Sequence, residues 1–330
     1  YMVKDGVFYR LNLPAFLQQM DGSLRAEFNR KASEPDPVVL RDFIHRHVDP
    51  TRFCLFRADA GAFQEVYNQN LTNPNTRLQI TLMTRSPGTW RAYIPGSSIK
   101  GAIRTAVVSE LAKANARIRR PVDPRSFEKN VLGHSDPRND PFRCLRISDA
   151  FLPEAIPTFI DKAEIFKPEQ GGGPDPAGIQ MFYEQCFSLL DEQEVVAHSE
   201  LLIDDKLPQK RYQDRRLNKE APAVSQAITA EQVVDSCRRF YVPKIESEHN
   251  RFYRSNPDLE SCNRPLLDVS FGANEFPIRL GRFSHIECVT VDGLRSPGGA
   301  AARRGFGKTR TLSGGNMALG WIKVSIRPIV

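Results

Sequence analysis

Long hydrophobic runs are missing from this sequence: nowhere in its 330 residues do 18 apolar residues follow one another. A membrane-spanning helix needs about 20 such residues, so no membrane span or membrane partner is expected. The six cysteines are scattered and form no C-x-x-C pair, which argues against a disulfide scaffold or a zinc ribbon. The first ten residues, YMVKDGVFYR, have no signal-peptide pattern. We therefore expect a cytoplasmic protein with reduced cysteines and with no bound metal or cofactor.

Acidic residues are missing from the last 38 positions. Between Gly293 and Val330 there are seven Lys or Arg residues and no Asp or Glu. These seven account for the whole formal net charge of +7, because residues 1–292 hold 39 basic and 39 acidic residues. Basic charge gathered in one segment is typical of a surface that binds a polyanion, most often nucleic acid. The alternative is a solvated basic tail that binds nothing.

Apolar residues alternate with polar ones in some segments and recur at spacings of three and four in others. The alternating segments predict strands within 6–13, 77–84, 142–151, 195–204, 276–284 and 321–329. The helical spacing predicts helices at 14–20, 25–49 with a break near 33–37, 98–115 and 229–254. Strands and helices interleave without a long parallel-strand pattern, which favours an α+β fold of the ferredoxin-like type.

We treat residues 1–330 as a single domain with two insertions. The first, at about 117–142, is polar and punctuated by prolines, so it is expected to be an exposed excursion. The second, at about 167–178, contains three consecutive glycines and is expected to be a mobile loop or the tip of a hairpin.

The stretch YIPGSSIKGAIRTA at positions 93–106 combines a turn with the start of a helix. Pro95 and Gly96 form a turn, and either Ser97 or Ser98 can cap the first free backbone amides of a helix that begins there. An apolar stripe then continues at helical spacing. A helix that starts after such a turn has free amides at its N-terminus, and these can bind a phosphate.

Two residues in this stretch do not suit the first turns of a helix. Lys100 lies where the helix dipole disfavours a cation, and Gly101 costs about 1 kcal/mol relative to alanine. A phosphate at the helix N-terminus would favour Lys100, and Gly101 would let an RNA backbone approach closely. Arg104 lies one turn further along on the same side. The candidate RNA-binding residues in this stretch are Gly96, Ser97, Ser98, Lys100, Gly101 and Arg104. The alternative is that the serines only cap the helix and Gly101 only packs.

The segment GFGKT at positions 305–309 resembles part of a phosphate-binding P-loop. The full motif needs another glycine five positions before Gly307, but that position is Ala302. A basic run precedes it in place of an apolar strand, so nucleotide hydrolysis is not expected. A flexible glycine-rich loop remains, whose cations can bind phosphate and whose aromatic residue can stack on a base. The candidate RNA-binding residues in this loop are Arg303, Arg304, Phe306, Lys308 and Arg310.

Groups suited to acid–base catalysis form no convincing set in the sequence. His45 and His47 lie two positions apart, Asp149 follows a predicted strand, and Glu246, Glu248 and His249 end a predicted helix. Each is better explained as a structural, capping or exposed residue, because charged residues usually lie at the surface. No catalytic residue is therefore assigned.

Several of these segments together resemble the RAMP superfamily, the RNA-binding proteins of CRISPR effector complexes. YIPGSSIKGAIRTA resembles the helix-opening motif of that superfamily, LRISDAF the strand that follows it, and GFGKTRTLSGG with ALGW its C-terminal glycine-rich loop and closing strand. Two further segments point to one subgroup of the superfamily: the opening YMVKDGVFYRLNLPAFL and the helix CRRFYVPKIESEHNRF. Within the superfamily, the chain is similar to the fifth subunit of type III-A (Csm) complexes, which caps the 3′ end of the CRISPR RNA.

The resemblance implies a core related to the RRM fold, a thumb-like insertion that grips the guide RNA, and contact with a neighbouring RAMP backbone subunit. In this chain the first strand that is usual in the family, and the glycine-containing turn after it, are expected to be absent. Backbone subunits of the same complexes cleave target RNA with an aspartate upstream of the I-P-G-S-S motif. Here no acidic residue occurs from Val66 to Lys100, which puts target cleavage in doubt.

The resemblance implies a non-catalytic subunit that binds and caps the 3′ region of CRISPR RNA, in support of guide maturation and antiviral defence. The partners it implies are CRISPR RNA, the neighbouring backbone subunit, target RNA and host nucleases that mature the guide. Two alternatives stay open. One is a RAMP endoribonuclease that processes guide RNA or cuts its target. The other is a protein-interaction subunit whose basic tail binds RNA only incidentally.

Overall fold

The computed structural model describes residues 1–74, 78–115, 124–134, 136–154, 157–168, 181–186, 195–214, 219–224, 226–292 and 307–329. The chain forms two compact units, which are described separately. Unit 1 comprises Tyr1–Tyr93, Leu152–Glu164 and Ala177–Ala197, and unit 2 comprises Ile94–Phe151, Ile165–Pro176 and His198–Val330. The sequence predicts one domain, whereas the structure gathers its hydrophobic side chains into separate cores within two units.

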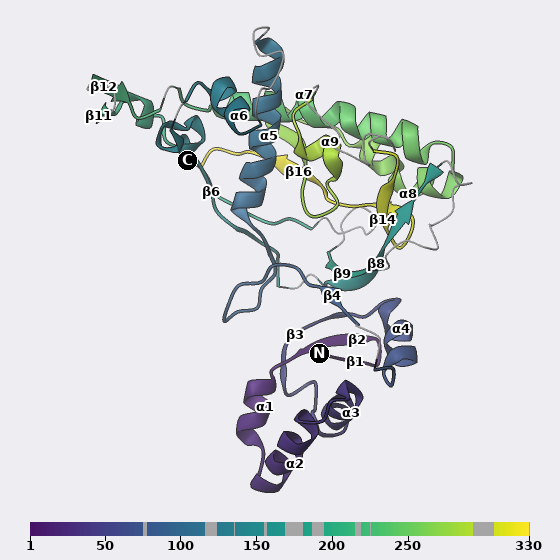
Figure 1. The fold of residues 1–330 in the computed structure, drawn as a ribbon. Helices are drawn as coiled ribbons and strands as arrows, with labels where there is room; N and C mark the ends of the chain where they lie inside the picture. Colours follow the sequence, from purple (N-terminus) through teal and green to yellow (C-terminus); the bar gives the residue numbers. More distant parts are fainter. Residues whose placement is uncertain are drawn as a thin grey trace. The chain divides into compact units, whose positions relative to one another are not determined.

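Unit 1 consists of a sheet with helices on both sides (Figure 1). Its strands are β1 (Met2–Lys4), β2 (Val7–Leu11), β3 (Cys54–Asp59), β4 (Ile80–Thr81), the first part of β8 (Phe159–Phe166) and β9 (Met181–Gln185). Its helices are α1 (Leu13–Gln19), α2 (Gly22–Ala32), α3 (Pro37–His47) and α4 (Phe63–Asn70). The strand order is β1-β2-β3-β8-β9-β4, with β3–β8 and β4–β9 parallel and the other pairs antiparallel.

Alternation along the strands gives the sheet of unit 1 two buried faces. Phe8 packs with Phe63 and Tyr67 of α4, while Leu11 packs with Phe16 of α1 and its neighbours. Side chains of consecutive strand residues point to opposite faces, so β2 contributes to both clusters. The helix predicted for 25–49 with a break near 33–37 is confirmed as α2 and α3.

Unit 2 holds two long helices, several shorter ones and four antiparallel strand pairs. Its helices are α5 (Gly96–Ala114), α6 (Pro124–Leu132), α7 (Ala230–Glu248), α8 (Pro257–Asp268) and α9 (His285–Val289), and a π-helical turn (His249–Tyr253) joins α7 to α8. Its strands are β6 (Leu145–Ile147), β7 (Ala150–Phe151), β10 (Leu201–Ile203), β11 (Arg211–Asp214), β12 (Lys219–Pro222), β13 (Glu275–Arg279), β14 (Arg310–Ser313), β15 (Met317–Ala318) and β16 (Trp321–Ser325), and β5 (Tyr93–Ile94) lies at the unit boundary. The chain is α+β, as predicted. The described helices include none long and apolar enough to span a bilayer.

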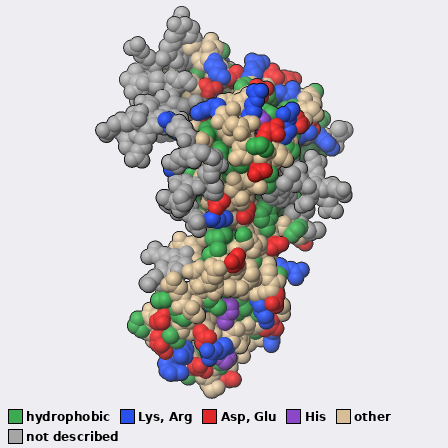
Figure 2. All heavy atoms as spheres, turned by 90° about the vertical axis from the view of Figure 1, so that its right-hand side faces the viewer, with side chains coloured by type: hydrophobic (Ala, Val, Ile, Leu, Met, Phe, Trp, Pro, Cys, Tyr) green, Lys and Arg blue, Asp and Glu red, His purple; other side chains and the backbone are tan. Residues whose placement is uncertain are grey.

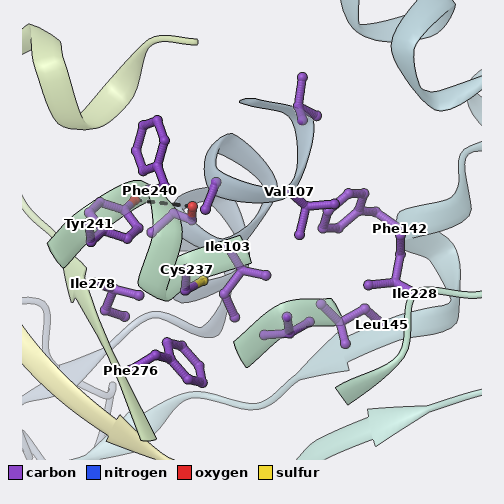
Figure 3. Close-up of a cluster of buried hydrophobic side chains, with 14 of the residues drawn as sticks. Ile103, Val107, Phe142, Leu145, Ile228, Cys237, Phe240, Tyr241, Phe276 and Ile278 are labelled. Atoms are coloured by element: carbon purple, nitrogen blue, oxygen red, sulfur yellow. Dashed lines mark hydrogen bonds between the residues drawn. The ribbon is translucent and has the colours of Figure 1, made fainter. Parts of the chain in front are cut away.

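The core of unit 2 lies between α5, α7 and β13. Ile103 of α5, Phe240 of α7 and Phe276 of β13 are all almost completely buried, and Figure 3 shows them within one cluster. The buried Tyr241 hydroxyl donates to the carbonyl oxygen of Ala102 at 3.1 Å. This bond ties α7 to the first turns of α5, so the packing of α7 helps to fix the position of the α5 N-terminus.

The excursion expected at about 117–142 is partly helical and packed. Residues 116–123 and 135 are outside the described part, but Pro124–Leu132 forms α6, and Phe127 and Leu132 are buried in the core. The expectation of an exposed, irregular segment is therefore wrong for α6. Proline at a first helical position is compatible with a helix, and Phe127, Val131 and Leu132 lie at helical spacing. The segment 169–178 of the second expected insertion lies outside the described residues.

A buried ionic cluster ties together the elements that follow α7. The Glu248 carboxylate lies 2.6 Å from Nη1 of Arg279 on β13 and 2.8 Å from Nε of Arg310 on β14. It also accepts hydrogen bonds from the Tyr253 hydroxyl at 2.7 Å and the Trp321 indole N–H at 3.2 Å. Glu248, Arg279 and Arg310 are each at most 3 % exposed. One carboxylate therefore links α7, the π-helical turn, β13, β14 and β16.

The charges of this cluster compensate one another. Burial alone would raise the pKa of Glu248, but Arg279 and Arg310 outweigh burial and hold that pKa below its ordinary value. Glu287 of α9 adds a second carboxylate, 3.3 Å from Nη2 of Arg310. Two cations thus face two anions, which is the condition under which buried charges are tolerated.

We predict that Glu248→Gln lowers the free energy of unfolding by about 3 kcal/mol at pH 7, because two buried guanidinium groups lose a charged partner. The pKa of Glu248 is lowered in the folded protein. Its stabilising contribution is therefore complete above the unfolded pKa, about 4.3, and is lost as the pH falls through the lower folded value. Urea unfolding measured from pH 7 to pH 3 should show a smaller loss of stability on acidification for Glu248→Gln than for the wild type.

The control is Glu246→Gln, which removes an exposed carboxylate from the same helix. Its free energy of unfolding should match that of the wild type within about 0.5 kcal/mol at pH 7. Equal losses for Glu246→Gln and Glu248→Gln would show that the ionic cluster does not hold unit 2 together.

Candidate RNA-binding site

The first turn of α5 is built against the segment between β6 and β7. The backbone N–H of Gly96 donates to Oδ1 of Asp149 at 2.8 Å. Gly96 is buried, and a Cβ atom there would lie closer than 3.0 Å to the carbonyl oxygens of Ile147 and Ser148. Only glycine allows this close backbone contact. The Asp149 carboxylate also lies where the helix dipole favours a negative charge.

This geometry corrects two expectations about the motif. Neither Ser97 nor Ser98 caps the helix through its side chain, because Asp149 of the neighbouring segment takes that position. Gly96, predicted to contact RNA, is instead buried and bonded to Asp149, so it is not available to a ligand. The side chains of Ser97 and Ser98 are exposed, and the Ser97 amide has no hydrogen-bond acceptor among the described residues.

Lys100 and Arg104 have partners within the protein. Nζ of Lys100 donates to the carbonyl oxygen of Leu145 at 2.6 Å, and its burial lowers the pKa of this lysine, although Asp140 acts in the opposite direction. Arg104 pairs with Asp140 at 2.8 Å and with Glu128 at 3.0 Å. The unusual position of Lys100 is thus explained without a phosphate. Contact of Lys100 and Arg104 with RNA stays a prediction.

Gly101 differs from Gly96 in its surroundings. It is exposed, and a Cβ atom built on it would meet no other atom within 4 Å. Its backbone conformation does not require glycine either, since it lies within a regular helix. Nothing within the described structure therefore demands glycine at position 101, whereas a ligand that approaches the helix backbone closely would demand it.

One basic residue near this helix start was not singled out in the sequence. Arg146 on β6 is exposed, forms no ion pair with a described residue, and lies close enough to Lys100 to contribute to lowering its pKa. Leu145 is buried and Ile147 is half-buried, so alternation along the strand turns Arg146 toward solvent. The same alternation in the segment LRISDAF could have identified it.

The glycine-rich loop is described only from Gly307 onward, so Arg303, Arg304 and Phe306 lie outside the described residues. Gly307 has a φ of 61°, and a Cβ atom there would overlap the Glu287 carboxylate. Its carbonyl oxygen accepts a hydrogen bond from Nη2 of Arg251 at 3.1 Å. The exit of the loop is therefore fixed to α9 and to the π-helical turn. Whether Lys308 contacts RNA stays a prediction.

Arg310 does not belong to an RNA-binding surface, contrary to expectation. It is 3 % exposed and pairs with Glu248 and Glu287, and its guanidinium lies 3.9 Å from the ring centroid of Phe252. The sequence showed no acid near this arginine because its acidic partners come from α7 and α9. Arg310 anchors the strand that leaves the loop.

Both motifs lie in unit 2, and α9 contacts each of them. It packs against α5, and its Glu287 contacts Gly307 and Arg310. Within the described residues, no three His, Cys, Asp or Glu side chains are arranged to hold a metal ion. The surface between the exposed start of α5 and Arg146 offers one free amide, two hydroxyls and cationic groups, which is chemistry suited to a phosphate backbone.

A family model described as the RAMP superfamily matches residues 81–292. The chain belongs to the RAMP superfamily. A chain in a cryo-EM structure of a Csm–crRNA–target RNA ternary complex of a type III-A CRISPR–Cas system is similar in fold, with a TM-score of 0.64 and 18% identity over 98% of this chain and 93% of that chain. The crystal structure of T. onnurineus Csm5 gives a TM-score of 0.56 and 16% identity over 98% and 94%. No curated protein sequence matched the chain.

The two glycines of α5 should respond oppositely to alanine. Gly96→Ala should lower the melting temperature by several degrees, because the new Cβ would overlap two backbone carbonyls that have little room to move. Gly101→Ala should raise the free energy of unfolding by about 0.5–1 kcal/mol, because alanine favours the helix and the site is open. Thermal unfolding of both variants beside the wild type tests this, and similar shifts for the two would contradict the assigned roles.

Proposed function

We propose that this RAMP protein is a non-catalytic subunit of a type III-A CRISPR effector complex that binds and caps the 3′ region of the CRISPR RNA. The observation that carries the proposal is the exposed start of α5. There Gly101 is exposed, and no described residue requires glycine at its position. The same helix start carries the exposed Ser97 and Ser98 and lies near Arg146, which has no ion-pair partner among the described residues. A helix surface kept open in this way suits the close approach of an RNA backbone.

The comparisons support the type of complex. The chain shares its fold over almost its full length with Csm5 and with a chain of a Csm complex that contains crRNA and target RNA. In this proposal the protein holds the guide through phosphates and shape with little reading of sequence, because the residues at the start of α5 are small or cationic. A neighbouring RAMP backbone subunit would continue the RNA-binding surface, and host nucleases would trim the guide beyond it.

The absence of acidic residues from Val66 to Lys100 supports a non-catalytic role. Oδ1 of Asp149, near the start of α5, already accepts the Gly96 amide, and Asp140 and Glu128 are paired with Arg104. A RAMP endoribonuclease that processes guide RNA or cuts its target is the alternative, and an RNA-cleavage assay separates the two.

Arg146→Ala should weaken the binding of single-stranded RNA without a change in melting temperature, because Arg146 is exposed and has no ion-pair partner among the described residues. The slope of log K against log salt should become shallower by about 0.7, the value for one lost phosphate contact. Fluorescence anisotropy at several salt concentrations measures both quantities. Arg46→Ala, which removes an exposed arginine of unit 1 that pairs with Asp42, serves as the control. Equal slopes for the wild type and Arg146→Ala would show that the surface at the start of α5 does not bind RNA.

The pure protein should cleave neither guide nor target RNA, with or without a divalent metal ion. Labelled RNA incubated with the protein and resolved on a denaturing gel tests this. Specific cleavage that one point substitution abolishes would establish the endoribonuclease alternative.

A further inference from the structure

A hollow of about 520 Å³ lies on unit 2 between the π-helical turn and α8. Its polar lining includes His249 and Asn250 of the turn, Arg254, which follows the turn, and Glu260 and Arg264 of α8. Pro257 and Leu267 form an apolar part of its wall. Its volume falls within the range of about 300–1,000 Å³ that is usual for small-ligand sites. It is separate from the start of α5, and none of its residues was assigned to RNA binding from the sequence.

The π-helical turn is itself an uncommon feature. Such turns are rare and often occur at functional sites. Here the turn brings His249 into the wall of the hollow with a residue exposure of only 4 %. Nδ1 of His249 is buried and has no hydrogen-bond partner among the described residues, and Nε2 is 3.9 Å from Oε1 of Glu260, which is too long for a hydrogen bond. Burial lowers the pKa of His249, although the neighbouring Glu260 acts in the opposite direction.

The charges that face the hollow are mixed. Arg254 is exposed, and no described residue pairs with it. Arg264 is shared between Glu260 at 3.1 Å and Asp268 at 3.4 Å. Figure 2, which shows the side of the molecule that includes α8, has Lys and Arg side chains interspersed with Asp and Glu over unit 2. A site with both signs of charge and an apolar wall suits a ligand that carries an anion, hydroxyl groups and a flat ring.

We propose that this hollow binds one ribonucleotide unit of the single-stranded RNA that the protein holds, with its phosphate at Arg254 and Arg264 and its ribose 2′-hydroxyl at Glu260. Guanidinium groups form strong, charge-assisted hydrogen bonds to phosphate oxygens. A carboxylate accepts from a ribose hydroxyl, and that contact is what distinguishes RNA from DNA. Asn250 and His249 supply polar groups for the base edge, and Leu267 supplies an apolar surface beside it.

The hollow is connected to the glycine-rich loop through the same turn. Arg251 of the π-helical turn donates to the carbonyl oxygen of Gly307, and Tyr253 of the turn donates to Glu248. The backbone that shapes the hollow is therefore fixed by the cluster that also anchors the exit of the loop through Arg310. This inference rests on the proposed function, because it assigns a further contact to the same RNA.

The test measures the binding of the full chain to a fluorescent oligouridine RNA and to the matching oligodeoxyuridine, which lacks only the 2′-hydroxyls. Arg254→Ala should weaken binding to both by about tenfold, since a charge-assisted contact to phosphate is lost. Glu260→Ala should weaken binding to RNA but not to DNA. The preference for RNA over DNA should therefore be several-fold smaller in this variant than in the wild type.

The chain offers matched controls. Asp235 and Arg239 form an exposed ion pair on α7 with the same i, i+4 spacing as Glu260 and Arg264. Asp235→Ala and Arg239→Ala should bind RNA and DNA as the wild type does, and all four variants should keep the wild-type melting temperature within a few degrees.

Two negative outcomes are distinguishable. If the wild type and the α7 controls bind RNA, and Arg254→Ala and Glu260→Ala bind it equally well, the hollow is not a nucleotide site while the proposed function stands. If the wild type binds no single-stranded RNA at all, the proposed function is wrong and the inference is overturned with it.

Discussion

The buried Glu248 carboxylate is the interaction on which the described part of unit 2 most depends. Isolated buried charges are strongly unfavourable, and a pair broken on one side costs several kcal/mol. Glu248 is satisfied by Arg279, Arg310, Tyr253 and Trp321, which come from four different elements. None of these elements can move far without leaving a charge or a polar group unpaired. The cluster therefore links α7, the π-helical turn and strands β13, β14 and β16.

Both candidate RNA-binding features of unit 2 draw on this rigidity. Arg310 holds the strand that leaves the glycine-rich loop, and Glu287 packs against Gly307 at its exit. Two turns before Glu248 on α7, the Tyr241 hydroxyl donates to the carbonyl oxygen of Ala102 and thereby helps to fix α5, whose first turns carry the exposed Gly101. The groups proposed to bind RNA thus lie on small, open surfaces that a well-packed interior holds in place. Such a division suits a protein that must grip a long, flexible ligand without reading its sequence.

The fold class and the long helices could be predicted from the sequence because they depend on local periodicity. The helix at 98–115, the broken helix at 25–49 and the closing strand near 321 all follow from the spacing of apolar residues. The roles of individual charged residues could not be predicted, because their partners are distant in sequence. In the sequence no acidic residue lies near Arg310, but in the structure it pairs with Glu248 and Glu287. Likewise, the position of Lys100 is explained only by the hydrogen bond from its amine to the Leu145 carbonyl oxygen. The sequence placed Gly96 in a turn and Gly101 in a helix, but the close contact of Gly96 with the backbone of Ile147 and Ser148 could not be predicted, because those residues are distant in sequence.

The central claim is that this protein holds a guide RNA. The most direct measurement is to purify the tagged chain from its native host and to determine the lengths of any RNA that copurifies with it. The account predicts a short RNA of one discrete length or a narrow set of lengths, because a subunit that caps the 3′ region would define where trimming of the guide stops. Protein that purifies free of RNA, or with fragments spread over all lengths, would contradict it.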